Sequence, residues 1–195
     1  MFEVIEKTKL VPNLHLLTLK APEIVETIQP GQFVILRSEE GAERIPLSIA
    51  DWNKKEGTLS IIFMVVGAST ERLSQLKTGD SIPTIVGPLG RATKIDKFGT
   101  VVCIGGCYGI GTILPIVKAL KKKGNKVISI LEARSHNLLY WADKIEPFSS
   151  RLFIITRDGS TGLKGHVKTS AELMNKNGIK PDRVIANGCT FLIYK

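Results

Sequence analysis

The fold of this chain is decided by the stretch Val101-Val102-Cys103-Ile104-Gly105-Gly106-Cys107-Tyr108-Gly109-Ile110-Gly111-Thr112. Its apolar beginning is typical of a buried strand, and the glycines that follow are typical of a tight turn. Beyond the turn, apolar residues recur at helical spacing and predict a helix with one buried face; they are Ile113, Ile116, Val117 and Leu120. The stretch therefore predicts a strand, a turn and a helix in direct succession.

The predicted turn leads into a helix N-terminus, where an anion can bind. The first backbone N–H groups of a helix lack partners within it and the helix dipole is positive there, so a dinucleotide pyrophosphate needs no charged side chain. The spacing Gly106-x-x-Gly109-x-Gly111 differs from the common Gly-x-Gly-x-x-Gly fingerprint. A tight turn without a ligand therefore stays open as an alternative. We expect Pro115 in the first helical turn, and Lys121-Lys122-Lys123 with Gly124 at the helix end.

Composition is that of an ordinary globular protein with one large domain or two small ones. Of the 195 residues, 27 are Lys or Arg and 18 are Asp or Glu, which gives a formal net charge of +9. This charge fits an acidic macromolecular partner, anionic ligands or solubility alone. The lysines are scattered and the aromatic residues are few, which disfavours nucleic-acid binding.

Cysteine usage and hydropathy bear on the compartment. No secretory leader and no apolar run of membrane-spanning length is evident, so we expect a cytoplasmic protein. The chain has three cysteines, Cys103, Cys107 and Cys189, which cannot all form disulfides, and this favours a reducing compartment. Three cysteines are also too few for a four-cysteine iron–sulfur site. The histidines are isolated and no metal-ligand or Ser-His-Asp pattern is evident, so no metal site is predicted.

The first half of the chain predicts a small antiparallel Greek-key β-barrel. Residues 1–95 carry short strand-like segments separated by Gly, Pro and Asn. Pro12-Asn13 predicts a hairpin turn, and residues 32–36 predict a core strand. Pro46 cannot donate a ladder hydrogen bond, so its segment is expected at an edge or irregular position with backbone groups free for a ligand.

A short helix is expected after Gly67, with Ser69 or Thr70 as its N-cap. The hydroxyl at this position has two interpretations. It either only satisfies the helix end or also marks a second phosphate site, for the same dipole reason.

From residue 100 onward, strands and helices alternate, which predicts an α/β domain with a parallel, Rossmann-like sheet. The predicted strands are residues 101–104, 127–131, 152–155 and 184–186, and further helices are expected over residues 138–145 and 167–174. We place the domains at residues 1–95 and 96–195, with residues 94–99 as linker. Ligands of such sheets bind beyond the carboxyl ends of the strands. Those ends are polar, small or glycine-rich, at residues 105–109, 132–134, 156–160 and 187–190.

In this order, four motifs of the first domain and two glycine-rich loops of the second resemble the ferredoxin–NADP reductase superfamily of two-domain flavoproteins. The motifs are Pro30-Gly31-Gln32-Phe33-Val34, Arg44-Ile-Pro-Leu-Ser-Ile, Gly67-Ala-Ser69-Thr70 with Gly79-Asp80-x-Ile82, and Gly87-Pro88-Leu89-Gly90. They are similar to one branch of the superfamily. This branch includes the dihydroorotate dehydrogenase electron-transfer subunit, the small subunit of NADH-dependent ferredoxin:NADP oxidoreductase and a sulfide dehydrogenase subunit. The resemblance covers essentially the full chain.

The resemblance implies an FAD site in the first domain and a pyridine-nucleotide site in the second. The implied FAD contacts are Arg44, Pro46, Leu47, Ser48, Phe63, Met64, Val65, Ser69 and Thr70. The implied nucleotide contacts are Gly105, Gly106, Cys107, Tyr108, Gly109 and Ile110 at the diphosphate, Glu132 and Arg134 at the adenosine end, and Asp158, Gly159, Gly188 and Cys189 at the nicotinamide side. Ser48 and Cys189 are the implied catalytic residues.

The chain departs from the family pattern at three places. Arg44 stands one position before the arginine of the superfamily's Arg-x-Tyr-Ser motif. Cys189 follows Gly188 where many relatives have Gly-Pro. Close relatives continue beyond the position of Lys195 with a cysteine-rich tail that binds a [2Fe–2S] cluster, so the cluster is expected on a missing tail or on a partner chain.

The resemblance implies a reductase subunit in a hetero-oligomer. The subunit would move a hydride between NAD(P)H and FAD, and single electrons to or from an iron–sulfur partner. Two alternatives are a non-catalytic nucleotide-binding regulatory module and a stand-alone flavin reductase with a small acceptor. NADH and NADPH both stay open, because Glu132 favours a 2′-hydroxyl and Arg134 a 2′-phosphate. Cys107 and Cys189 are both expected at strand ends, where they can face one another across the ligand crevice, either as small packing residues or with a role near the nicotinamide.

Overall fold

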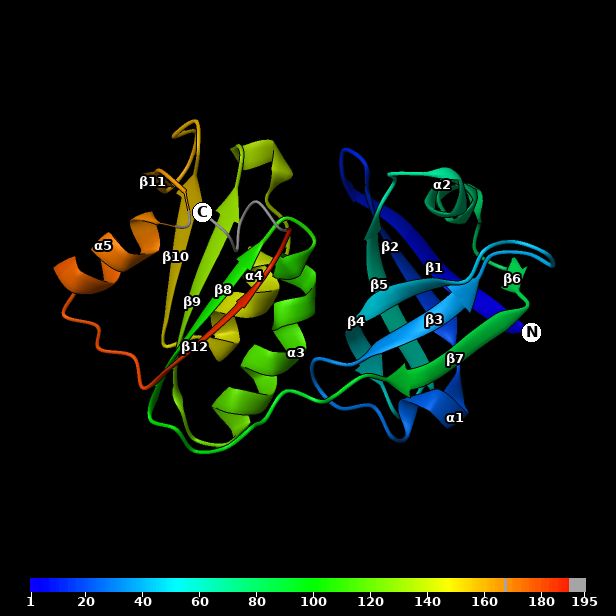
Figure 1. Ribbon diagram of the computed structural model, residues 1–195, viewed down its shortest axis with the longest axis horizontal. Coiled ribbons are helices and arrows are strands. Elements are labelled where there is room, and N and C mark those ends of the chain that lie inside the picture. The colour runs from blue at the N-terminus through cyan, green and yellow to red at the C-terminus, as the bar shows by residue number, and fades with distance from the viewer. Residues whose placement is uncertain (167, 190–195) are drawn as a thin grey trace. The chain divides into compact units, whose positions relative to one another are not determined.

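The structure is a computed structural model that describes residues 1–166 and 168–189. The chain divides into two compact units, Met1–Thr93 and Lys94–Lys195 (Figure 1). Residues 91–98 carry no regular secondary structure. None of the described helices is long and apolar enough to cross a membrane. Two sequence-based expectations, for the loop residue Thr190 and for Val167 at the start of a helix, lie outside the described residues.

The first unit is one antiparallel sheet of seven strands in the order β6-β1-β2-β5-β4-β3-β7. Its two edge strands are consecutive in the chain and are separated only by Pro83, so the sheet must curve round until its edges approach, which makes a near-closed barrel. The bounds are β1 Phe2–Val11, β2 Leu14–Lys20, α1 Pro22–Val25, β3 Phe33–Arg37, β4 Ile45–Asn53, β5 Thr58–Met64, α2 Ala68–Gln75, β6 Ser81–Ile82 and β7 Thr84–Leu89. Strands β3, β4 and β5 are sequential neighbours, and β2 lies beside β5, which is a Greek key. The predicted barrel is confirmed.

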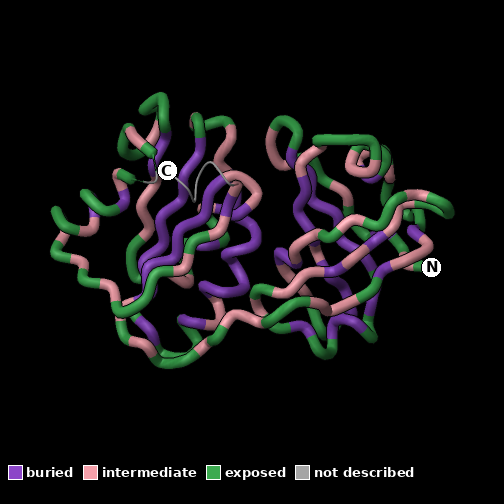
Figure 2. The backbone as a smooth tube through the Cα atoms, in the orientation of Figure 1, coloured by how far each residue is buried: buried purple, intermediate pink, exposed green. Residues whose placement is uncertain are grey.

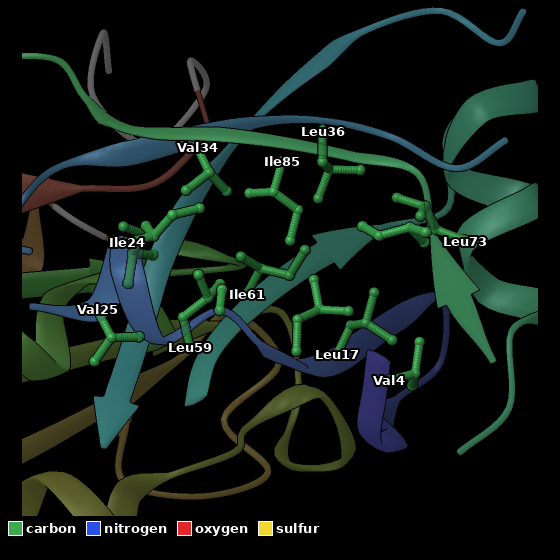
Figure 3. Packing of buried hydrophobic residues seen from close by; sticks show 14 of the residues in the cluster. Val4, Leu17, Ile24, Val25, Val34, Leu36, Leu59, Ile61, Leu73 and Ile85 are labelled. Carbon is green, nitrogen blue, oxygen red and sulfur yellow. The ribbon is translucent and has the colours of Figure 1, made fainter. Parts of the chain in front are cut away.

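The barrel is held together by a single apolar core (Figure 2). Alternate residues of β5, Leu59, Ile61 and Phe63, are at most 2% exposed, as the period of two in a strand requires. Leu17 of β2, which pairs with Ile61 of β5, belongs to the same cluster and is labelled in Figure 3. The predicted hairpin turn at Pro12-Asn13 is confirmed: Asn13 has a φ of +62°, and Val11 pairs with Leu14.

The predicted irregularity at Pro46 has a simple structural form. Strand β4 lies between β3 and β5, but its two ladders cover different halves of the strand. Pro46 pairs with Ile35 of β3, whereas the ladder with β5 begins only at Ile49. On the β5 side, the first residues of β4 are therefore a local edge, which is where a proline without an N–H is tolerated.

The second unit is a five-stranded parallel sheet in the order β11-β10-β9-β8-β12. Its elements are β8 Thr100–Gly106, α3 Gly109–Lys122, β9 Lys126–Ala133, η1 His136–Leu138, α4 Ala142–Ile145, η2 Glu146–Phe148, β10 Arg151–Thr156, β11 Leu163–Lys164, α5 Thr169–Lys176 and β12 Arg183–Asn187. Strands β8, β9 and β10 follow one another in one direction, and β12 returns to the other side of β8. This is the strand arrangement of a Rossmann-like half, so the predicted fold class is confirmed for both units.

Two helix expectations are wrong in detail. Helix α3 begins at Gly109, because the glycine-rich turn forms the first helical turn itself, and Pro115 therefore lies inside the helix. The helix expected over residues 138–145 is broken, because Trp141 adopts a left-handed conformation with a φ of +56°. Tyr140 and Trp141 are 8% and 7% exposed, so burial of these two rings overrides the local helical pattern.

Candidate functional site

In the first unit, the candidate cofactor residues Ser69 and Thr70 lie in the first turn of α2. The expectation that one of them is the N-cap is wrong, because Gly67 occupies that position. Thr70 instead reaches back: its Oγ1 accepts hydrogen bonds from the backbone N–H groups of Val66 (3.0 Å) and Gly67 (3.1 Å) and donates to the Gly67 carbonyl (2.9 Å). The hydroxyl thus fixes the turn that presents the following backbone amides of α2, which lack acceptors within the helix.

The loop that carries Arg44 contacts the same helix. Ser69 Oγ donates to the Glu43 carboxylate at 3.3 Å, and Arg72 Nε lies 3.1 Å from Glu39 Oε1. Arg44 itself is exposed. The structure therefore brings the predicted phosphate residues of α2 beside the segment that leads into β4.

The other predicted flavin residues occupy two neighbouring strands. Pro46 is exposed, and Leu47 and Ser48 are half-buried at the start of β4. At the end of β5, Met64 and Val65 are half-buried as well. Phe63 differs, since it is 2% exposed and stacks on His15 with ring centroids 5.7 Å apart. Phe63 is thus part of the barrel core.

In the second unit, the strand order reverses between β8 and β12, and ligands of open parallel sheets bind at such a switch point. The ladder places Asn187 opposite Gly105, so the two chain segments leave the sheet side by side. The sequence-predicted residues 105–110 and 188–189 meet here. The two segments meet because β12 lies beside β8 in the sheet, and no local sequence motif predicts this strand order.

Two glycines allow the close packing at this point. A Cβ on Gly109 would lie 2.7 Å from the Gly188 nitrogen and would also collide with the Asn187 carbonyl. A Cβ on Gly105 would lie 3.1 Å from the Gly109 oxygen and from the Ile110 Cα. Both glycines are therefore required for packing, which is independent of any ligand. The turn also forces Cys107 to a φ of +56°, a conformation that costs a non-glycine residue about 1 kcal/mol or more.

Tyr140 is a site residue that sequence reasoning missed. Its hydroxyl accepts a hydrogen bond from the Gly111 N–H (3.0 Å) and donates to the carbonyls of Cys107 (3.0 Å) and Tyr108 (3.1 Å). Burial raises the pKa of Tyr140 well above its usual value, so this hydroxyl remains protonated. Tyr140 therefore holds the glycine-rich turn in place through hydrogen bonds. No local sequence pattern identifies Tyr140 as a site residue.

We expect Tyr140→Phe to destabilise the second unit by about 1–2 kcal/mol, because the hydrogen bonds of a buried hydroxyl to the turn are lost, although the Gly111 N–H and both carbonyls keep backbone partners. Urea unfolding followed by tryptophan fluorescence measures the change. Tyr108→Phe is the matched control: it removes only the hydrogen bond from a half-buried hydroxyl to the Gly188 carbonyl (2.9 Å). Equal losses in the two variants would contradict the special role of Tyr140.

Cys107, which is predicted at the diphosphate, and Cys189, which is predicted at the nicotinamide side, are in contact. Burial chiefly raises the pKa of the Cys107 thiol, and the hydrogen bond between the Cys107 and Cys189 side chains acts in the same direction. Both residues are half-buried, and both are thiols. The two cysteines thus face one another, an arrangement that fits both small packing residues and a role near the nicotinamide.

The predicted adenosine-side residues lie at the ends of β9 and β10. Glu132 is 2% exposed, and its Oε1 lies 2.9 Å from Nε of Arg157, a residue that sequence reasoning did not single out. Arg134 is exposed. The backbone N–H of Asp158 donates to the Arg134 carbonyl at 3.2 Å, which joins the two strand ends.

The exposed loop after β10 is held by Asp158, whose Oδ1 accepts hydrogen bonds from the Ser160 hydroxyl (2.6 Å) and backbone N–H (2.9 Å). These bonds lower the pKa of Asp158. Gly159 within the loop is exposed and has a φ of +78°. The candidate nicotinamide-side residues thus belong to two places, the Asp158 loop beyond β10 and the pair Gly188-Cys189 beyond β12.

No protein-family model matches the chain. A Thermotoga maritima protein, the dihydroorotate dehydrogenase B (NAD(+)) electron transfer subunit homolog, is 40% identical over 85% of this chain and 58% of its own length. The dihydroorotate dehydrogenase B electron transfer subunit of Enterococcus faecalis is 31% identical over 99% of this chain and 74% of its own length. The chain belongs to this electron transfer subunit family. The predicted family resemblance is confirmed.

Solved structures agree with membership of the electron transfer subunit family. The NADH-dependent reduced ferredoxin-NADP oxidoreductase has a chain with a TM-score of 0.85 and 37% identity, over 90% of this chain and 63% of that one. A Neisseria gonorrhoeae ferredoxin NADP+ reductase with bound FAD and NADP has a TM-score of 0.74 at 16% identity, over 95% of this chain and 83% of that one, and supports the fold alone. The chain spans 58% of the Thermotoga maritima relative and 66% of a Clostridium beijerinckii relative.

Proposed function

We propose that the chain is an FAD-containing electron-transfer subunit. It moves a hydride between NAD(P)H and FAD, and single electrons to or from an iron–sulfur partner. What supports this proposal most strongly is the 31% identity to the Enterococcus faecalis electron transfer subunit over 99% of the chain. We further propose that it works in the cytoplasm, in a hetero-oligomer with an iron–sulfur or catalytic subunit, and that the [2Fe–2S] cluster belongs to a tail outside this sequence or to that partner.

The residues of the first unit fit FAD. The first turn of α2, set by Thr70, offers unpaired amides and a positive dipole to a pyrophosphate. At the local edge of β4, half-buried Leu47 offers an apolar surface and Ser48 a hydroxyl, which suit a flavin ring and its ribityl chain. Arg44 is exposed beside this segment and can reach a phosphate or carbonyl. We propose Ser48 as the catalytic hydroxyl, and Pro46, Met64, Val65 and Ser69, with the Phe63 backbone, as further contacts.

The residues of the second unit fit a pyridine nucleotide. The turn after β8 joins a helix N-terminus at the topological switch point, where the positive end of the helix dipole favours a diphosphate. Tyr140 holds the turn in place. We propose residues 105–110 for the diphosphate, Glu132 and Arg134 for the adenosine end, and Asp158, Gly159, Gly188 and Cys189 for the nicotinamide end.

The chemistry itself belongs to the cofactor: bound FAD accepts two electrons as a hydride and releases them one at a time. The protein supplies binding and orientation. The test is an anaerobic titration of the purified protein with NADH and, separately, NADPH. We expect a visible flavin absorption that bleaches with one nucleotide at lower concentration than with the other. Protein that neither contains nor takes up FAD would contradict the proposal and favour a regulatory module.

We expect Thr70→Val to weaken FAD binding about fivefold to tenfold, because loss of the hydroxyl that orders the first turn of α2 costs about 1 kcal/mol. Flavin fluorescence during titration of the apoprotein measures the affinity. Ser74→Ala is the matched control, since Ser74 lies on the same helix and its hydroxyl donates only to the Glu71 carbonyl at 2.7 Å. Equal effects of the two substitutions would count against a cofactor site at the N-terminus of α2.

A further inference from the structure

Two thiols meet at the topological switch point of the second unit. Cys107 stands two residues after Gly105 and Cys189 two residues after Asn187, and the parallel ladder pairs Gly105 with Asn187. The two cysteines therefore lie just beyond the ends of adjacent strands, each two residues after a paired position. Adjacent strands are about 4.8 Å apart, and a disulfide spans Cα separations of about 4.4–6.8 Å.

Contacts on both sides of the cysteines hold the two segments together. The Tyr108 hydroxyl donates to the Gly188 carbonyl at 2.9 Å, and the missing side chain of Gly109 admits the Asn187 carbonyl. Between these contacts, the side chains of Cys107 and Cys189 are close enough to interact with each other. A bond between the two sulfurs keeps the strand order but draws the turn after β8 and the segment after β12 closer together, because the S–S bond is about 2 Å long.

We propose that Cys107 and Cys189 are a redox modification site that forms a reversible disulfide under oxidising conditions. Cytosolic disulfides are commonly of this transient, redox-sensing kind. The oxidant is a low-molecular-weight disulfide. The Cys189 thiolate attacks one of its sulfurs, the disulfide bond breaks, and one small thiol leaves. The Cys107 thiolate then attacks the Cys189 sulfur, and the second small thiol leaves. The two cysteine protons end on the two small thiols, so the oxidant gains the two electrons that the protein loses.

The order of attack follows from burial. Burial raises the pKa of Cys107, so its thiolate forms less readily and acts second. Cys103 takes no part, because it is fully buried within β8 and its pKa is raised to about 12. Cys103 therefore serves as an internal control, because it should remain a thiol when Cys107 and Cys189 are oxidised.

The disulfide has a consequence for ligand binding, and this consequence rests on the proposed function. A covalent link between the turn after β8 and the segment after β12 fixes the turn that presents amides to the nucleotide diphosphate. We expect oxidation to lower nucleotide affinity at least about tenfold, and dithiothreitol to restore it. Bound nucleotide should in turn slow the oxidation.

The test treats the full chain with oxidised glutathione and digests it with trypsin under non-reducing conditions. Cleavage after Lys97, Lys118 and Arg183 separates Cys107 and Cys189 onto the peptides 98–118 and 184–195. Cys103 shares the first peptide, so the experiment uses Cys103→Ala, or fragment-ion sequencing of the natural chain if that variant does not fold. We expect a cross-linked peptide pair that disappears on reduction and in Cys189→Ser. Separate peptides, each unmodified or carrying glutathione, would overturn the proposal.

Nucleotide affinity of the reduced protein separates the two hypotheses. A cross-link in a protein that binds no nucleotide supports the thiol pair and contradicts the proposed function. Nucleotide binding without a cross-link overturns the thiol pair and leaves the proposed function standing.

Discussion

Replacing Gly109 with alanine should destabilise the second unit by about 3 kcal/mol and weaken nucleotide binding more than tenfold. The new Cβ would lie 2.7 Å from the Gly188 nitrogen and would press on the Asn187 carbonyl. These are backbone atoms at the end of β12, so no side chain can rotate away. Helix α3 or β12 must shift, and either shift moves the glycine-rich turn.

The measurement is urea unfolding followed through Trp141, in a Trp52→Phe background, because Trp141 lies in the second unit and Trp52 in the first. Gly124→Asn is the matched control at the other end of α3. Gly124 has a φ of +86°, which asparagine tolerates, and nothing lies within 4 Å of a Cβ there. A loss below about 1 kcal/mol for Gly109→Ala would show that the close packing of β8, α3 and β12 is not required.

Arg157→Leu should cost about 2–3 kcal/mol of unfolding free energy. The substitution leaves the carboxylate of Glu132, only 2% exposed, without its partner at 2.9 Å. Removing one partner of a fully buried pair costs about 3–5 kcal/mol, and the 39% exposure of the Arg157 side chain reduces this figure. The other carboxylate oxygen of Glu132, Oε2, has no hydrogen-bond partner among the described residues. The contact between Oε1 and Arg157 is therefore more important for the stability of this buried carboxylate.

A double-mutant cycle isolates this effect. In Glu132→Gln/Arg157→Leu the buried group is neutral, and we expect most of the lost stability to return. Arg151→Leu, at the start of β10, is the surface control: exposed Arg151 donates to Asn177 Oδ1 at 2.8 Å and lies over the Phe153 ring, and its loss should cost about 0.5 kcal/mol. A single Arg157→Leu loss no larger than that of the double variant would contradict the argument.

Much of the fold can be predicted from the sequence because its signals are local. The alternation in residues 59–63, the turn at Pro12-Asn13 and the glycine-rich junction at residues 105–109 each depend on neighbours in the chain. The expected helix over residues 138–145 fails for the opposite reason. Tyr140 and Trp141 adopt conformations set by tertiary burial, and local propensity is too weak to resist it.

The candidate site is predictable only in part. Motif resemblance places candidates at the turn after β8 and at the start of α2, where the structure has helix N-termini. It does not find Tyr140 or Arg157, because each acts on a partner distant in the sequence: Tyr140 on Gly111 and Arg157 on Glu132. It also assigns Phe63 a cofactor contact without knowing that the ring stacks on His15 in the core.

The strand orders of both units have a consequence for synthesis on the ribosome. In each unit a late strand inserts beside an early one: Ile82 of β6 pairs with Phe2 of β1, and β12 pairs with β8. Until these late strands emerge, β1 and β8 each present an unpaired edge, and that of β8 is strongly apolar. The nascent chain therefore passes twice through a stage at which a chaperone can bind and at which aggregation competes with folding.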